Sequence, residues 1–186
     1  MSSIYELQLE IAAPAESQLE TAENDVELVY SAHGPTHFLT IWQEAATPLS
    51  AAMIAIAQLR NSGIKVHRAV EDLVSRQDIA DRLNVSRQAV GNWIRGERRG
   101  SEGESFPNPY NAVGGGVWLW KDVNDWAHGI AATDHDVEHL AAIDYVLINH
   151  WIHHDDLVVW TPSSINGSEE PISAWTTTDK PQLRSL

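Results

Sequence analysis

The strongest constraint on the fold is the spacing of helix signals in one stretch, SRQDIADRLNVSRQAVGNWIRG. Ser75 and Asp78 form an S-x-x-D capping box, which is typical of a helix N-terminus. Asn84 follows that first helix and tolerates the left-handed backbone of a tight turn. Ser86 then caps a second helix, and Gly96 closes it. The stretch therefore predicts two short helices joined by a tight turn.

The apolar side chains of this stretch recur where two crossing helices would touch. Ala80 is the small residue that a close crossing needs, and five larger side chains complete a core: Ile79, Leu83, Val85, Val90 and Trp93. This is the pattern of a helix-turn-helix, a motif whose second helix enters the major groove of DNA. The recognition helix would be residues 86–95.

The outward side of that second helix carries the residue types that contact DNA. The residues expected to face outward are Arg87, Gln88, Gly91, Asn92 and Arg95, and all of these except Gly91 would read or anchor on the major groove. Arg87 and Gln88 are expected to face the groove, where such side chains bind base edges. Ser86 can offer its hydroxyl and nearby N–H groups to a phosphate. Arg82, on the first helix, is as consistent with a solvated surface charge as with a DNA contact.

The chain is acidic, with a formal net charge of -14, whereas DNA binding draws much of its affinity from neutralising phosphates. The charges are unevenly placed. Residues 60–99 hold nine of the twelve Lys and Arg residues, whereas residues 1–59 hold eight acids and no Lys or Arg. Because the screening length at physiological salt is about 8 Å, a distant acidic domain need not cancel a local basic face. The composition permits specific DNA binding and predicts weak non-specific binding.

The first 71 residues alternate between strand and helix patterns. YELQLEI alternates apolar and polar side chains as a half-buried strand does, and AESQLETAE indicates a short acidic helix. Two strands follow around a turn at Gly34 and Pro35, then a helix capped by Thr47, and then the strand IKVHRAV. The order β-α-β-β-α-β predicts an α+β protein that begins with a ferredoxin-like sandwich over residues 1–71.

Two motifs follow one another within residues 72–130: VSRQDIADRLNVSRQAVGNWIRG and FPNPYNAVGGGVWLWKDVNDWA. They resemble the winged helix-turn-helix of MerR-type and excisionase-type DNA-binding proteins. In that family a β-wing with a Phe-Pro pair follows the two helices, and a strand with an aromatic residue leads into a short helix beginning with Asp-Val. The resemblance implies a recognition helix at 86–95 and a wing near 97–119. Arg98 and Arg99 would grip phosphate there.

Residues 131–157 carry a longer helical pattern. Thr133 and Asp136 form a capping pair before HDVEHLAAIDYVLINHWIHH, which predicts a helix over residues 134–153. The resemblance implies that this helix pairs with its twin in a homodimer. The remaining residues, 158–186, are rich in Ser, Thr and Pro without any period, and they predict a loosely ordered tail.

The histidines of the same pattern allow a second hypothesis. HDVEH satisfies the H-x-x-E-H string, which on a helix places His135 and His139 one turn apart, the spacing of two zinc ligands. A catalytic zinc site would also need a third ligand and a substrate cleft. A solvated polar face is the simpler interpretation, so no cofactor is expected, and His135 and His139 stay as candidates for adventitious or structural metal binding.

These patterns predict a sequence-specific DNA-binding transcriptional regulator, most simply a repressor, that binds double-stranded DNA as a homodimer and catalyses no reaction. Two other classes stay open. One is an excisionase-like architectural factor, and the other is an acidic protein-interaction module (antitoxin-like or a DNA mimic) whose N-terminal domain binds a protein partner. No signal-peptide pattern is present, and no apolar run reaches the 18 or so residues of a membrane span. A cytoplasmic protein is therefore expected.

Overall fold

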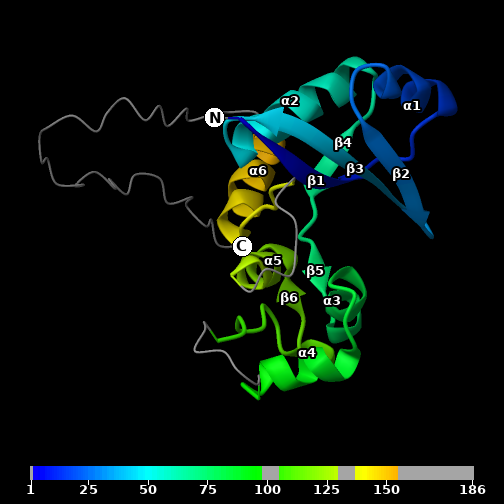
Figure 1. The fold of residues 1–186 in the computed structure, drawn as a ribbon. Coiled ribbons are helices and arrows are strands. Elements are labelled where there is room, and N and C mark those ends of the chain that lie inside the picture. Colours follow the sequence, from blue (N-terminus) through cyan, green and yellow to red (C-terminus); the bar gives the residue numbers. More distant parts are fainter. Residues whose placement is uncertain (1, 98–104, 130–136, 155–186) are drawn as a thin grey trace, which may run out of the picture. The chain divides into compact units, whose positions relative to one another are not determined.

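The computed structural model describes residues 2–97, 105–129 and 137–154, and the structural statements below concern those residues. The chain divides into two units, residues 1–156 and 157–186. The predicted loose tail, 158–186, falls in the second unit and lies outside the described residues. The first unit is α+β, and its described part contains a four-stranded antiparallel sheet and six α-helices (Figure 1). None of the described helices is long and apolar enough to cross a membrane.

The four-stranded sheet forms where apolar and polar residues alternate. Its strands are β1 (Ser3–Ile11), β2 (Leu28–His33), β3 (Thr36–Ala45) and β4 (Val66–Ala69). They lie in the order β2-β3-β1-β4, and all neighbours are antiparallel. Leu9 pairs with Leu39 across the two central strands, and both side chains are fully buried. The predicted alternation of β1 is confirmed, since Leu7, Leu9 and Ile11 are at most 2% exposed.

Two helices connect these strands, α1 (Glu16–Glu23) and α2 (Pro48–Asn61). The observed order is therefore β-α-β-β-α-β, as the sequence predicts. Thr47 caps α2 by accepting a hydrogen bond from the Ser50 N–H at 3.1 Å. Gly63 follows the helix with a φ of 76°. α2 covers one face of the sheet (Figure 1), and the side chains that it buries are mostly small: Ala51, Ala52, Ala55, Ile56 and Leu59.

The region predicted to be a helix-turn-helix has a core of its own. Its elements are β5 (Leu73–Val74), α3 (Arg76–Arg82), α4 (Arg87–Ile94), the 3-10 turn η1 (Val113–Gly115), β6 (Trp118–Leu119) and α5 (Trp120–His128). β5 precedes the two helices and pairs antiparallel with β6, which follows them. Ten buried residues form the core: Val74, Ile79, Ala80, Leu83, Val90, Trp118, Trp120, Val123, Trp126 and Ala127.

The region predicted as a wing, residues 97–119, differs from the expectation. Residues 105–117 form the turn η1 and a single bridge between Asn111 and Val117 rather than two long strands. β6 is only two residues long, because Trp120 already begins α5. Arg98 and Arg99 lie outside the described residues.

The predicted helix over 134–153 is wrong at its start. α6 spans Ala142–His154. Before it, the Glu138 N–H donates to the Ile4 carbonyl at 2.7 Å, and the Glu138 carbonyl accepts from the Glu6 N–H at 3.1 Å. This pairing with β1 replaces helical hydrogen bonds. Residues 130–136 lie outside the described part, so the predicted cap at Thr133 and Asp136 does too.

α6 belongs to the sheet rather than standing apart from it. It packs against β4 and α2 and buries Tyr145 and Ile148 in the core of the sheet. Asn149 fixes the contact, since its side chain both donates to the Ala69 carbonyl at 3.0 Å and accepts from the Ala69 N–H at 2.7 Å. Leu119 of β6 also joins this core rather than that of the helix pair.

Candidate nucleic-acid interface

Local hydrogen bonds fix the two helices of the predicted motif. The Ser75 hydroxyl accepts from the Gln77 and Asp78 N–H groups at 3.2 and 3.3 Å, and the Asp78 carboxylate accepts from the Ser75 N–H at 2.8 Å. Asn84 makes the turn with a φ of 51°. The Ser86 hydroxyl accepts from the Ala89 N–H at 3.1 Å and caps α4. The predicted caps and turn are confirmed.

The predicted apolar core of the motif is confirmed too. Ile79 and Val90 are fully buried, and Ala80 is 1% exposed. Trp93 of α4 packs against Trp126 of α5, with ring centroids 5.1 Å apart. Phe106 adds an edge-on contact to Trp126 at 4.8 Å. Because this aromatic cluster fixes the position of α4, the backbone that carries the outer side chains of the helix is held in place.

The outer side of α4 begins with three exposed residues, Ser86, Arg87 and Gln88. Neither Arg87 nor Gln88 forms a side-chain hydrogen bond or ion pair with another described residue. Asn92 is half-buried. Gly91, which was expected to face outward, is buried: a Cβ there would lie 3.4 Å from Arg95 Nη1, since the Arg95 side chain folds over it.

Arg95 is exposed but is held by its neighbours. Its Nε lies 3.0 Å from Glu97 Oε1, and its Nη2 donates to Asn92 Oδ1 at 2.6 Å. Hydrogen bonding to Arg95 lowers the pKa of Glu97 from its usual value. Arg95 and Asn92 would therefore have to exchange these contacts before either could bind DNA, whereas Arg87 and Gln88 would not.

A positively charged hollow lies beside the start of α4. It measures about 180 Å³ and is lined by Ser75, Arg76, Gln77, Arg87 and residues 114–116. Arg76 Nη2 donates to the Gly115 carbonyl at 3.0 Å. Within the described part of the chain, Arg76 Nε is buried and has no hydrogen-bond partner. The lining thus holds two guanidinium groups and no carboxylate.

The wall of that hollow depends on glycine. Gly114, Gly115 and Gly116 have φ values of 61°, 93° and 106°, which other residues rarely adopt. A Cβ on Gly116 would also lie 2.7 Å from the Trp118 ring. Neither this glycine run nor Arg76 is among the site residues predicted from the sequence. The run of three glycines was the available signal for a backbone approached closely by another group.

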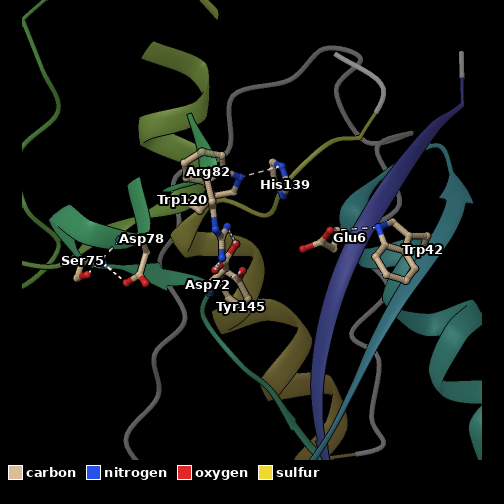
Figure 2. Close-up of polar contacts among 9 residues, drawn as sticks. All are labelled: Glu6, Trp42, Asp72, Ser75, Asp78, Arg82, Trp120, His139 and Tyr145. Carbon is tan, nitrogen blue, oxygen red and sulfur yellow. Dashed lines mark hydrogen bonds and ion pairs between the residues drawn. The ribbon is translucent and has the colours of Figure 1, made fainter. Parts of the chain in front are cut away.

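A second polar cluster joins the motif to the sheet (Figure 2). Arg82, at the end of α3, binds Asp72 through both terminal nitrogens, at 2.6 and 2.8 Å. Its guanidinium also stacks over the Trp120 ring, 4.7 Å from the centroid. Arg82 therefore lies at the surface, with its side chain 39% exposed, and is held there by Asp72 and Trp120.

The prediction that His139 lies on a helix is wrong. His139 precedes α6, and His135 lies outside the described residues. His139 Nε2 instead accepts from the Trp120 indole N–H at 3.1 Å (Figure 2). Burial lowers the pKa of His139 and raises the pKa of Tyr145, on the other side of Asp72, to about 12.

The capping box makes the stability of the motif depend on pH. Hydrogen bonding with the side chain and then the backbone of Ser75 lowers the pKa of Asp78. A lowered pKa in the folded state adds stability above the unfolded pKa of about 4, and this stability is lost as the pH falls through the folded value. We expect Asp78→Asn to be less stable than the parent protein at pH 7. The difference in the free energy of unfolding between the two proteins should become smaller below pH 4.

Urea unfolding at pH 7 and pH 3 measures this effect. Asp81→Asn, an exposed acid on the same helix that does not bond to Ser75, is the matched control and should show a smaller dependence on pH. Equal behaviour of the two variants would contradict a capping role for the Asp78 charge.

No protein-family model, curated protein or solved structure matches the chain.

Proposed function

We propose that this chain is a sequence-specific DNA-binding transcriptional regulator, with α4 as its recognition helix. The observation that carries the proposal is the pair Arg87 and Gln88 at the exposed start of α4, whose side chains have no hydrogen-bond or ion-pair partner in the described part of the chain. A rigid helix N-terminus with such side chains is what major-groove readout requires. Gln can bind adenine through two hydrogen bonds, and Arg can bind guanine in the same way.

The two-arginine hollow supplies the complementary contact to the DNA backbone. Phosphate contacts set the register of a protein on the duplex, while base contacts specify the sequence. Arg76 has a buried Nε with no hydrogen-bond partner among the described residues, and Arg87 borders both the hollow and the exposed start of α4. We propose that one backbone phosphate binds between these two arginines, against residues 114–116.

The remaining roles follow from this proposal. The N-terminal part is proposed to be a ferredoxin-like sandwich, because its strand order and connections are those of β-α-β-β-α-β folds. The motif itself is proposed to be a winged helix-turn-helix. Its work is binding rather than catalysis, in the cytoplasm and as a homodimer. The acidic sheet would disfavour binding to the wrong DNA.

The test of the function is selection from random DNA. The full-length chain is mixed with duplexes that carry a randomised central segment, and bound duplexes are recovered and sequenced over several rounds. Enrichment of one motif is expected, followed by preferential binding of that duplex over a scrambled one in fluorescence anisotropy. Failure to enrich any sequence, with equal feeble binding of both duplexes, would contradict the proposal.

The phosphate site makes a separate prediction. Arg76→Ala should weaken binding to the selected duplex and to the scrambled one by similar factors, because a phosphate contact carries no sequence information. The slope of log affinity against log salt concentration should fall by about 1.

Arg68→Ala is the matched control, since that arginine is paired with Glu10 on the sheet at 2.8 Å. Its affinity and salt slope should match those of the parent protein. If Arg76→Ala changed the preferred sequence and left the salt slope intact, the phosphate role would be wrong.

A further inference from the structure

Three side chains that can bind a metal ion lie close together where the sheet joins the helix pair. They are Glu6 of β1, Asp72 before β5, and His139 before α6, and one ligand atom of each lies within 4.8 Å of the others. They border a hollow of about 150 Å³ whose other lining residues include Thr40, Arg82 and Tyr145. Among the described residues, no other group of three side chains has this geometry.

The charges around this hollow do not balance. Arg82 gives both terminal nitrogens to Asp72. Glu6 accepts one hydrogen bond, from the Trp42 indole N–H at 3.1 Å (Figure 2), and no described cation forms an ion pair with it. The lining thus holds two carboxylates against one guanidinium. A half-enclosed site with a surplus negative charge and an imidazole nitrogen attracts a cation.

We propose that Glu6, Asp72 and His139 bind a divalent transition-metal cation, with Zn²⁺ preferred over Mg²⁺. An imidazole together with two carboxylates is a ligand set for zinc, whereas Mg²⁺ prefers oxygen ligands and retains several waters. Zinc bonds to nitrogen and oxygen are about 2.0–2.2 Å long, so tetrahedral ligand atoms lie about 3.4 Å apart. The three ligand atoms, which lie within 4.8 Å of one another, would take up about that spacing around a bound zinc ion.

Binding must rearrange the hydrogen bond to Trp120. A neutral imidazole has one lone pair, and the Trp120 indole N–H occupies it on Nε2. A cation either displaces that N–H or coordinates Nδ1 after the ring proton has moved to Nε2. In both cases Trp120 loses its acceptor. Asp72 can serve the metal and Arg82 together, because a carboxylate has about four lone-pair sites.

The site would brace the junction between the two cores. Its ligands come from three separate segments, and Arg82 links one of those ligands to the last turn of α3. A cation that binds the folded chain alone raises its apparent stability by mass action. The expected effect is a higher melting temperature with Zn²⁺, which does not depend on whether the protein binds DNA.

The experiment must distinguish zinc binding at this site from zinc binding at a pair of histidines on α6. His150 and His154 lie on the exposed side of α6 with ring centroids 4.5 Å apart, a spacing that can chelate zinc by itself. The background is therefore the full-length chain without a histidine tag, carrying His150→Ala and His154→Ala. Zn²⁺ and Mg²⁺ are titrated into it by isothermal calorimetry, with tryptophan fluorescence followed in parallel.

The background protein is expected to bind one Zn²⁺ per chain, at least 10-fold more tightly than Mg²⁺, and to change its tryptophan fluorescence. In that background, His139→Ala and Glu6→Gln should each weaken Zn²⁺ binding at least 10-fold, whereas Glu10→Gln, on the same face of β1, should not. Circular dichroism tests whether each variant is folded. If His139→Ala is unfolded, the Zn²⁺ affinity of Glu6→Gln decides whether the proposal holds. The proposal is overturned by an absence of stoichiometric binding, by equal affinity for Mg²⁺, or by binding that survives Glu6→Gln.

Discussion

Replacing both Arg87 and Gln88 by alanine is expected to abolish the preference of this protein for its selected duplex. A well-placed two-point contact between a side chain and a base is worth about 1–3 kcal/mol of discrimination. Losing two such contacts should lower specific affinity by about 2 kcal/mol or more, which is roughly 30-fold. Fluorescence anisotropy on the selected and scrambled duplexes measures both the loss and the preference that is left.

Arg95→Ala is the informative comparison for that variant. Arg95 lies on the same helix and is exposed, but Glu97 and Asn92 already bind it. Its replacement should therefore cost less affinity than replacing Arg87 and Gln88. If Arg95→Ala removed the sequence preference while the double variant retained it, the base-reading surface would lie at the C-terminal end of α4 and the present assignment would be wrong.

Trp118→Ala is expected to cause the largest loss of stability. Trp118 is 1% exposed, packs edge-on against Phe106, and donates its indole N–H to the Pro107 carbonyl at 3.0 Å. Truncation of a buried tryptophan to alanine costs about 3–5 kcal/mol. Urea unfolding followed by circular dichroism gives the change in the free energy of unfolding.

Two further variants show how the change in the free energy of unfolding of Trp118→Ala should be interpreted. Trp118→Phe keeps much of the apolar contact but removes the donor to Pro107, so it should lose less stability than Trp118→Ala. Val113→Ala, in the turn η1 that precedes β6, removes a side chain that is 69% exposed and should change stability by no more than about 0.5 kcal/mol. A Trp118→Ala loss no larger than that of Val113→Ala would mean that Trp118 does not organise this core.

The features that could be predicted from sequence are those set by neighbouring residues. The boundaries of α3 and α4 follow from Ser75, Asn84 and Ser86, whose side chains or backbone act within a few positions of themselves. The alternation of β1 likewise reports burial on one face, and the structure confirms it. For the candidate interface, these local signals were enough to place Arg87 and Gln88 on an exposed helix start.

The features that sequence analysis missed depend on partners far along the chain. Residues 137–141 carry a helical pattern, yet the Glu138 backbone pairs with β1 more than a hundred residues earlier. The meeting of Glu6, Asp72 and His139 has no local signature for the same reason. Arg76 was passed over because its partner, the Gly115 carbonyl, is 39 positions away.

Leu119 has a consequence for any attempt to dissect this protein. By sequence it belongs to the helix-turn-helix region, and it pairs with Leu73 in the small sheet, but its side chain is buried in the core of the N-terminal sheet. A fragment that starts near residue 72 would therefore expose the Leu119 side chain to water. A fragment that ends near residue 71 would have a cavity in its core at the place that Leu119 fills. The two regions differ in composition and charge, but they are not interchangeable modules. Transfer of residues 72–130 to another protein would need a substitute for the apolar core that buries Leu119.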